Sequence, residues 1–254
     1  MCAYEQNIVI DLEFNPTPRK VGRGLRFEII EIGAVKLDAQ GNAKGEFSCL
    51  VKPQYSRFVR KNIIALTGIK TCDVSQAPML EEAIASLARW IGDASSRIVA
   101  WSKNDQRQIK RECAHKSIEV PPQLRRWLDL QAVYPRVMNV GNGRQMKLST
   151  AADWYGAELD QSSAHRALYD AKVTSELLRQ LLTGAYQQQK VALDSAMANS
   201  AESGARLSAS LGDACAGLAA LKQQLLAQGA EATCKIGRAV QQECRDRSRM
   251  PSSA

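Results

Sequence analysis

Two apolar segments of strand length near the start of the chain limit the fold more than any other feature. Residues 7–14 (NIVIDLEF) and 28–37 (EIIEIGAVKL) are rich in β-branched side chains, and turn-forming residues follow each of them. A third strand is predicted at residues 45–51 (GEFSCLV), and the short connection over residues 38–44 is typical of a hairpin. We therefore expect the chain to open with an antiparallel meander.

Helical periodicity alternates with short apolar segments after the meander. A helical pattern begins at Pro78, with Glu81 and Glu82 in its first turn, where the helix dipole favours acidic side chains. A short buried strand is predicted at residues 97–101 (RIVAW). The other expected segments are helices over residues 105–115, 148–155 and 164–182, and an apolar segment at residues 127–130 followed by a further helix. This order predicts an α/β fold, in which a mixed sheet of antiparallel and then parallel strands is flanked by helices.

The composition changes after about Gly184 to alanine, glutamine and serine with almost no aromatic side chains. We expect one domain over residues 1–184, a helical extension over 185–237, and a polar, basic, disordered tail over 238–254. Apolar side chains in the extension alternate spacings of four and three, which places them on one helix stripe: Leu207, Leu211, Ala214, Leu218, Leu221 and Leu225. Such a stripe indicates either packing or self-association, or a dedicated protein partner.

Composition limits the class of protein. The 254 residues carry a net charge of +8, which fits a polyanionic partner such as nucleic acid but is shared by many other proteins. The seven cysteines form no C-x-x-C pair, so neither a disulfide framework nor a zinc site is indicated. The start lacks the pattern of a signal peptide, and no apolar run reaches about 18 residues, the length of a membrane span. We expect a cytoplasmic protein.

Two acids interrupt the first apolar strand. Asp11 and Glu13 are two residues apart, so their side chains emerge on one face of the strand while Leu12 points to the other. A solvated acidic edge strand is one interpretation of this pair. Their position at the end of the most apolar strand of the chain favours another, because buried acids must be paired or bound to metal.

Two further acids and a histidine follow later in the chain. Asp105 comes shortly after the RIVAW strand, where it is either the N-cap of the next helix or a site residue. Asp170 lies within a predicted buried helix, and His165 precedes it by five residues, so the two cannot share a regular helix face. We expect His165 in the entry turn or first turn of that helix, from which both side chains converge on one pocket.

Together these residues resemble the three motifs of the DEDDh exonuclease superfamily. The motifs are DLE from Asp11 to Glu13, an acid at Asp105 after a strand and turn, and H-x-A-x-x-D from His165 to Asp170. In the related DEDDy group a tyrosine stands four residues before the final aspartate. Here that position is Arg166, which favours the histidine branch. The resemblance covers about residues 7–182 and implies a ribonuclease H-like fold and 3′→5′ exonuclease activity.

Other segments resemble the Eri-type exonucleases, many of which act on RNA 3′ ends. These are EIIEIGAVKLD, the tetrapeptide LTGI at residues 66–69, and Trp101 four residues before Asp105. The substrate-binding residues predicted from this resemblance are Phe14, Leu66, Thr67, Trp101 and Arg166. In the resemblance Leu66 wedges against the last base, and Phe14 either stacks on a base or fills the core. Arg166 and the loop residues Arg19, Lys20, Arg23 and Arg26 either meet phosphates or form a solvated basic surface.

Four carboxylates with one histidine and no cysteine form a hard oxygen site, which suits Mg²⁺ or Mn²⁺ and not Zn²⁺. The resemblance implies two ions, with Asp11 bridging them, Glu13 and Asp170 on the nucleophile side, and Asp105 on the other. His165 would then take a proton from the attacking water.

We expect hydrolysis of nucleic acid from a free 3′ end, one nucleoside 5′-monophosphate at a time. The choice between DNA and RNA stays open at this point. Two rival hypotheses are a nuclease-fold protein that acts by binding a regulatory partner and a polymerase proofreading subunit.

Overall fold

A five-stranded mixed sheet forms the centre of the part of the chain that the structure describes. The computed structural model describes residues 4–18, 24–138, 145–154 and 165–185. The strand order is β3-β2-β1-β4-β5, with bounds β1 Gln6–Pro16, β2 Phe27–Asp38, β3 Ala43–Leu50, β4 Ser96–Ala100 and β5 Trp127–Asp129. The first three strands are antiparallel neighbours, whereas β4 is parallel to β1 and β5 is parallel to β4. The expected meander and mixed sheet are therefore confirmed.

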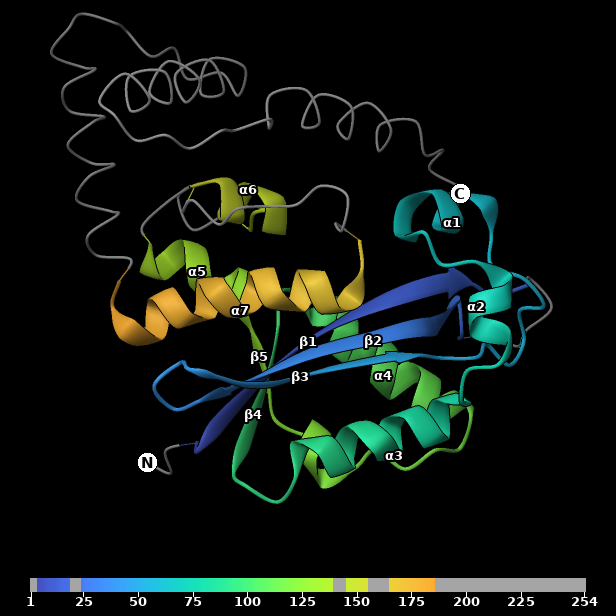
Figure 1. Ribbon diagram of the computed structural model, residues 1–254, viewed down its shortest axis with the longest axis horizontal. Coiled ribbons are helices and arrows are strands. Elements are labelled where there is room, and N and C mark those ends of the chain that lie inside the picture. The colour runs from blue at the N-terminus through green and yellow to red at the C-terminus, as the bar shows by residue number, and fades with distance from the viewer. Residues whose placement is uncertain (1–3, 19–23, 139–144, 155–164, 186–254) are drawn as a thin grey trace, which may run out of the picture. The chain divides into compact units, whose positions relative to one another are not determined.

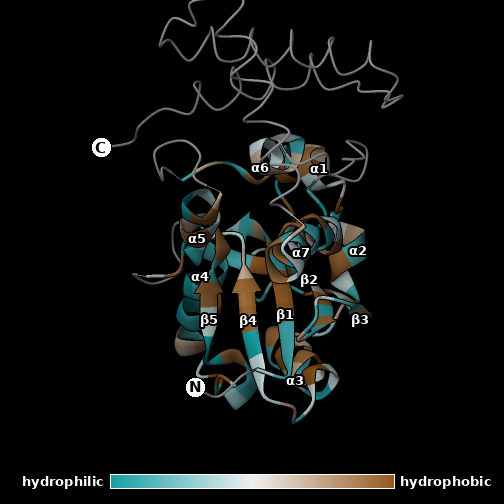
Figure 2. Cartoon of the chain, turned by 90° about the vertical axis from the view of Figure 1, so that its left-hand side faces the viewer, coloured by the Kyte–Doolittle hydropathy of each residue, from teal (hydrophilic) through white to brown (hydrophobic). Residues whose placement is uncertain are grey.

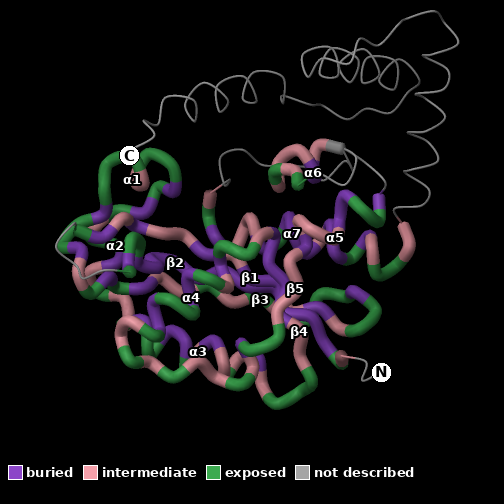
Figure 3. The backbone as a smooth tube through the Cα atoms, turned by 180° about the vertical axis from the view of Figure 1, so that it is seen from behind, coloured by how far each residue is buried: buried purple, intermediate pink, exposed green. Residues whose placement is uncertain are grey.

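Helices cover both faces of the sheet (Figure 1). Their bounds are α1 Lys61–Thr67, α2 Thr71–Ser75, α3 Leu80–Ile91, α4 Lys103–His115, the 3₁₀ helix η1 Pro122–Leu124, α5 Leu130–Val137, α6 Leu148–Trp154 and α7 Ala167–Thr183. On one face, α3 and α4 pack against the alternate β1 side chains Ile8, Ile10 and Leu12. On the other face, α5, α6 and α7 pack around Val9. Because both faces are covered, the first half of β1 is buried (Figure 3), and its residues Ile8, Val9 and Ile10 are apolar. Figure 2 shows that β1 has a hydrophobic and a hydrophilic segment.

Several boundaries differ from those predicted. Helix α3 begins at Leu80 and not at Pro78, and its N-cap is Met79, whose backbone is extended. Helix α4 begins at Lys103, and its N-cap is Ser102, whose hydroxyl accepts a hydrogen bond from the Asn104 N–H at 3.2 Å. Asp105 is therefore not the N-cap, and of the two interpretations considered from the sequence only that of a site residue is left. The short helices α1 and α2 have too few residues for the periodic pattern by which longer helices are found.

A buried ionic network joins β2 to α4 on the α3–α4 face. The Lys116 ammonium lies 3.1 Å from Glu28 and 2.7 Å from Glu112, and both carboxylates are fully buried. Glu28 also accepts hydrogen bonds from the backbone N–H groups of residues 54, 55 and 56, and Glu112 accepts one from the Ile29 N–H. Every carboxylate oxygen is thus paired, as buried charge requires. The network fixes the chain after β3 relative to α4.

Some predicted features lie outside the described residues. They are the loop cations Arg19, Lys20 and Arg23, the extension beyond residue 185 and the tail over residues 238–254. Helix α7 ends at Thr183 with Gly184 as its C-cap in a left-handed conformation, at the point where the composition changes. Among the described residues, no helix is both long and apolar enough to span a bilayer.

Candidate active site

Strand β1 carries the first two acids of the site. Asp11 and Glu13 alternate with Ile10 and Leu12, so their carboxylates lie on the face that carries Val9 and is covered by α7. Both side chains are half-buried. The acidic edge strand considered from the sequence is excluded, because β1 is the central strand and has neighbours on both sides.

Gly33 allows the first turn of α7 to pack directly against β2, beside Asp11. It lies in β2 directly opposite Asp11. A Cβ atom at this position would lie 2.1 Å from the carbonyl carbon of Ala167 and from the Leu168 nitrogen, a distance at which atoms overlap. Only a residue without a side chain allows this approach of helix to sheet. The helix therefore begins directly on the strand pair that carries Asp11.

Asp170 lies in the first turn of α7, where its backbone N–H donates to the Arg166 carbonyl at 3.0 Å. One carboxylate oxygen from each of Asp11, Glu13 and Asp170 can be chosen so that all three oxygens lie within 4.8 Å of one another. Two of these acids come from the central strand β1 and one from α7. Oxygen atoms gathered in this way can coordinate a hard divalent cation.

Asp105 approaches the same acids from α4, the helix that follows β4. It is 5% exposed, and the backbone N–H of Leu12 donates a hydrogen bond to its carboxylate. Strand β4 pairs with β1 only as far as Val9, which leaves the later part of β1 open to α4 on this side. The carboxylate of Asp105 lies outside the tight cluster of three, yet its charge acts on both Asp11 and Glu13.

Burial and mutual repulsion raise the pKa values of these acids. Burial, followed by the charges of Asp105 and Asp170, raises the pKa of Asp11 well above its usual value. Burial and then Asp170 and Glu31 raise the pKa of Glu13 to about 9. Burial raises the pKa of Asp105 to about 7, against the lowering effect of backbone N–H groups. Without a cation the ionised forms of these carboxyl groups are therefore disfavoured, and a divalent cation would offset their negative charge.

Glu31 is a site residue that was not predicted from the sequence. It is 1% exposed and lies directly opposite Glu13 across β1 and β2. The Arg166 guanidinium forms two-pronged hydrogen bonds with its carboxylate, the shortest at 2.6 Å, and the Ala167 N–H donates to it at 2.9 Å. Glu31 therefore fastens the start of α7 to the sheet. Glu31, like Asp11, is an acid within an apolar strand and therefore needs a partner, so the sequence already indicates that it is paired or bound to metal.

His165 lies in the turn before α7, as expected from its spacing to Asp170. Its φ angle is +65°, a left-handed conformation that is uncommon outside glycine but is adopted by histidine more often than by most residues. It precedes by two residues Ala167, whose backbone touches Gly33 beside Asp11. His165 is half-buried and lies just before the N-terminus of α7, and Asp170 lies in the first turn of the same helix.

The predicted substrate-binding residues fall into two groups. Leu66 is 47% exposed on α1, where it is free to meet a base, and the Arg166 side chain is half-exposed while bound to Glu31. Trp101 and Thr67 are buried. The Trp101 indole N–H donates to the Met146 carbonyl, and the Thr67 hydroxyl donates to the Ile63 carbonyl.

The ring of Phe14 lies on the opposite face of β1 from the carboxylates. It packs against the α3–α4 core and lies 6.5 Å from the Phe27 ring, measured between centroids. This is the core-filling alternative of the two considered for Phe14. Its contact with substrate stays a prediction, as do those of the other four residues.

The mixed sheet and its covering helices form a ribonuclease H-like fold, and the cluster of acids lies on its central strand and on α7. A family model described as RNase_T, Exonuclease matches residues 8–178. The chain therefore belongs to this exonuclease family.

Two curated relatives are similar in sequence. ERI1 exoribonuclease 2 of Danio rerio is 29% identical over 211 residues, which cover 74% of this chain and 37% of the relative. A putative bifunctional exonuclease/endonuclease protein of Mycobacterium tuberculosis is 31% identical over 154 residues, which cover 61% of this chain and 23% of the relative. The chain thus spans less than two fifths of the length of either relative.

A solved structure shares the fold. The nuclease domain of 3′hExo, a DEDDh family member crystallised with rAMP, superposes with a TM-score of 0.63 at 20% identity. The match covers 71% of this chain and 93% of that domain. At this identity the likeness shows the fold, and the chemistry rests on the residues described above.

Proposed function

We propose that this protein is a two-metal 3′→5′ exonuclease that removes nucleoside 5′-monophosphates from a free 3′ end, with RNA as its preferred substrate. The observation that carries the proposal is the cluster of Asp11, Glu13 and Asp170 oxygens within 4.8 Å. RNA is proposed because the zebrafish relative is an exoribonuclease and the related nuclease domain was crystallised with rAMP.

The acids fit Mg²⁺ or Mn²⁺. We assign Asp11, Glu13 and Asp170 as the residues that would bind the cations directly, and Asp105 as a fourth acid that would add negative charge from α4. All four offer oxygen, the donor that these hard cations prefer, and their raised pKa values show how unfavourable the bare charges are. When bound, the cations supply charge that activates water and stabilises the phosphate in the transition state.

The residues of the chain then divide the work. His165 accepts a proton from the attacking water, whose oxygen forms the new bond to phosphorus as the bond to the 3′ oxygen breaks. The leaving 3′ oxygen takes a proton from solvent, so the shortened strand ends in a new 3′ hydroxyl, and the released nucleotide carries a 5′ phosphate. The ion pair between Glu31 and Arg166 holds the start of α7 in place, so that His165 and Asp170 keep their positions during this step.

Asp11→Asn is the decisive test of this function, because an amide in the place of Asp11 cannot offset divalent charge. We expect the wild type to shorten a 5′-labelled strand stepwise and to release label from a 3′-labelled strand as mononucleotide. These activities should need Mg²⁺ or Mn²⁺ and stop with EDTA. The variant should be folded and inactive. Wild-type turnover by Asp11→Asn, or equal activity of the wild type in EDTA, would sink the assignment.

Matched RNA and DNA strands of one sequence test the substrate. We expect a higher kcat/KM on RNA, because recognition of the 2′-hydroxyl separates the two. Equal values on both would reject the RNA preference and leave the nuclease assignment intact.

A further inference from the structure

The segment over residues 56–60, called here the Phe58 segment, is held rigidly by hydrogen bonds to its backbone. The Asn15 side chain donates to the Phe58 carbonyl at 3.2 Å and accepts from the Arg60 N–H at 3.0 Å. The Ser56 N–H donates to the buried Glu28 carboxylate at 2.9 Å. The Val59 N–H donates to the Thr71 hydroxyl at 3.0 Å. The path of this backbone is therefore fixed before any ligand arrives.

The side chains of the Phe58 segment divide sharply between inside and outside. Val59 is 3% exposed and packs with Ile30, Ile69 and Val74 beneath α1 and α2. Phe58, the residue before it, is 66% exposed, the largest exposed fraction among the exposed large hydrophobic side chains of the described residues. Because hydrogen bonds hold the backbone of this segment in place, the fold itself keeps the Phe58 ring exposed to solvent.

The Phe58 segment borders the active site. Asn15, which binds the backbone on both sides of Val59, follows Glu13 by two residues in β1, about 7 Å along a strand. The charges of Asp73 in α2 and of Arg166 beside α7 act on each other's pKa values. In Figure 1 the start of α7 faces the end of the sheet that α1 and α2 cover. A strand leaving the carboxylates in this direction crosses the Phe58 segment.

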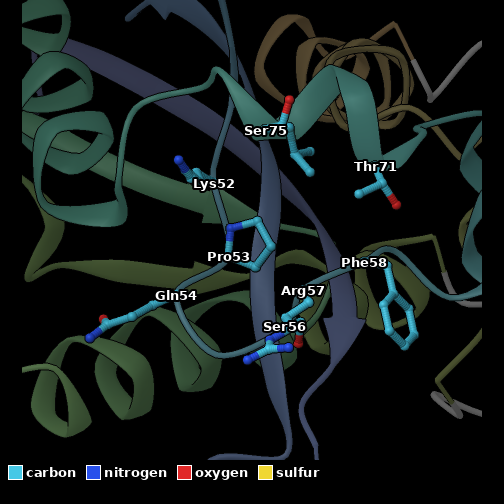
Figure 4. Close-up of a pocket in the computed structure, with 9 residues that line it drawn as sticks. Lys52, Pro53, Gln54, Ser56, Arg57, Phe58, Thr71 and Ser75 are labelled. Carbon is cyan, nitrogen blue, oxygen red and sulfur yellow. The ribbon is translucent and has the colours of Figure 1, made fainter.

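Basic side chains surround the exposed ring. Two surface pockets adjoin at Phe58, and their linings contain Lys52, Arg57, Arg60 and Lys61 but no acid. All four cations are exposed, and none is in an ion pair with a carboxylate of the described residues. Figure 4 shows Arg57 and Phe58 on one side of the first pocket, with the ring directed away from Thr71. An aromatic face among unpaired cations is the composition that binds single-stranded nucleic acid.

We propose that the Phe58 segment is a second binding site for the substrate strand, which stacks a base upstream of the scissile nucleotide on Phe58 and holds its phosphates with Arg57, Arg60 and Lys61. This inference rests on the proposed exonuclease function. Stacking is tolerant of sequence because every base has an aromatic face, so the site would grip any single strand and favour substrates long enough to reach it.

Binding to the full-length protein tests the site without catalysis. In the Asp11→Asn background, Phe58→Ala should weaken binding of a 5′-fluorescent single-stranded RNA by roughly 5- to 100-fold, the range measured for loss of one base stack. Phe58→Trp should restore it and Phe58→Leu should not, because leucine keeps apolar area without an aromatic face. Val137→Ala removes another exposed apolar side chain, on α5, and should bind as the parent does. Wild-type affinity of Phe58→Ala, or full rescue by leucine, overturns the proposal.

An abasic residue moved one position at a time through the last nucleotides of the RNA locates the stacked base. We expect one upstream position at which the abasic substitution weakens binding to the parent but not to Phe58→Ala. Equal losses for both proteins at every position would contradict stacking on Phe58. Arg60→Ala should lower the slope of log affinity against log salt by about 0.7, the value for one phosphate of a single strand, and an unchanged slope would remove Arg60 from the site.

A substrate too small to reach Phe58 separates this inference from the function on which it rests. We would compare kcat/KM for the RNA with that for the 4-nitrophenyl ester of thymidine 5′-monophosphate. Phe58→Ala should lower the ratio of the two values by roughly 5- to 100-fold. If the wild type cleaves both and the ratio does not change, the second site is wrong and the exonuclease stands. If the wild type cleaves neither, the proposed function fails, and the binding experiments still decide whether Phe58 holds a strand.

Discussion

At the scale of single residues, the site shows which side chains a sequence can identify. Asp11 and Glu13 could be predicted because alternation in a strand fixes the face on which their side chains lie. Glu31 obeys the same rule, yet its importance depends on Arg166, which is 135 residues away in sequence. Lys116 was equally hidden, since a lysine in a polar stretch gives no sign that two buried carboxylates surround it. Residue spacing in the sequence therefore does not predict ion pairs between residues that are distant in the chain.

His165 offers the sharpest residue-scale test of the mechanism. Changing it to Ala should leave binding of metal and RNA intact and slow single-turnover hydrolysis by about a hundred- to ten-thousand-fold, the usual contribution of a general base. The remaining activity should also lose the fall at acid pH that protonation of an imidazole imposes.

The left-handed backbone of His165 calls for a second variant. Alanine disfavours this conformation, whereas asparagine adopts it readily but cannot act as the base. His165→Asn should therefore be as slow as His165→Ala while keeping the stability of the wild type. An unchanged rate in both variants, measured where chemistry limits turnover, would remove histidine from the mechanism.

At the scale of helices and strands, the order of the elements was predictable and several of their ends were not. Long periodic segments such as α3 and α7 were found, because each buries a stripe along its length. Helix α4 begins at Lys103, two residues before Asp105, and the Ser102 hydroxyl caps it. The sequence did not fix this start, because an aspartate in the first turn of a helix resembles an aspartate at the N-cap. The contact of α7 with Gly33 has no local signature at all.

Gly33→Ala tests that contact. The added methyl group would overlap the backbone of Ala167 and Leu168, which cannot rotate away as a side chain could. We expect a loss of about 3 kcal/mol or more in the free energy of unfolding, measured by urea denaturation, and weaker binding of Mg²⁺ as Asp170 moves from Asp11. Gly45→Ala is the matched control, because its Cβ would lie 3.8 Å from the Trp90 ring, an ordinary contact. If Gly33→Ala is as stable as Gly45→Ala, α7 does not depend on this close approach.

At the scale of the whole molecule, the acids make stability depend on pH and metal together. The pKa of Glu13 is raised from 4.5 to about 9, so between these values the unfolded chain has lost a proton that the folded protein keeps. Raising the pH through this range therefore disfavours folding. The metal-free Tm should fall from pH 5 to pH 8, and the rise in Tm caused by Mg²⁺ should grow over the same range.

Asp11→Asn serves as the control for this dependence. The pKa of Asp11 is also raised, partly because the other acids repel its negative charge. The asparagine variant lacks this charge, so its Tm should fall less as the pH rises from 5 to 8. Its Tm should also rise less when Mg²⁺ is added. A metal-free Tm that rises from pH 5 to pH 8 in the wild type would contradict the electrostatic account of the site.

The division of the chain after about Gly184 is a proposal at the same scale. Helix α7 ends there, and the family match ends at residue 178. A protein that stops after residue 185 should fold and cleave a short RNA at the rate of the full chain, while self-association or binding of a protein partner should change. We would measure kcat/KM and the mass in solution for both lengths. A folded but inactive shorter protein would place part of the active site beyond Gly184.

The docking of α7 on Gly33 also bears on the timing of synthesis. Asp11 and Asp170 are 159 residues apart (170 − 11), so the first acids leave the ribosome long before the last. At about 5 to 20 residues per second, the interval is roughly 10 to 30 s. During that time the nascent chain displays Asp11 and Glu13 without their partner. If the proposed function holds, the nascent protein cannot cleave its own messenger RNA until α7 has been synthesised and has docked on the sheet.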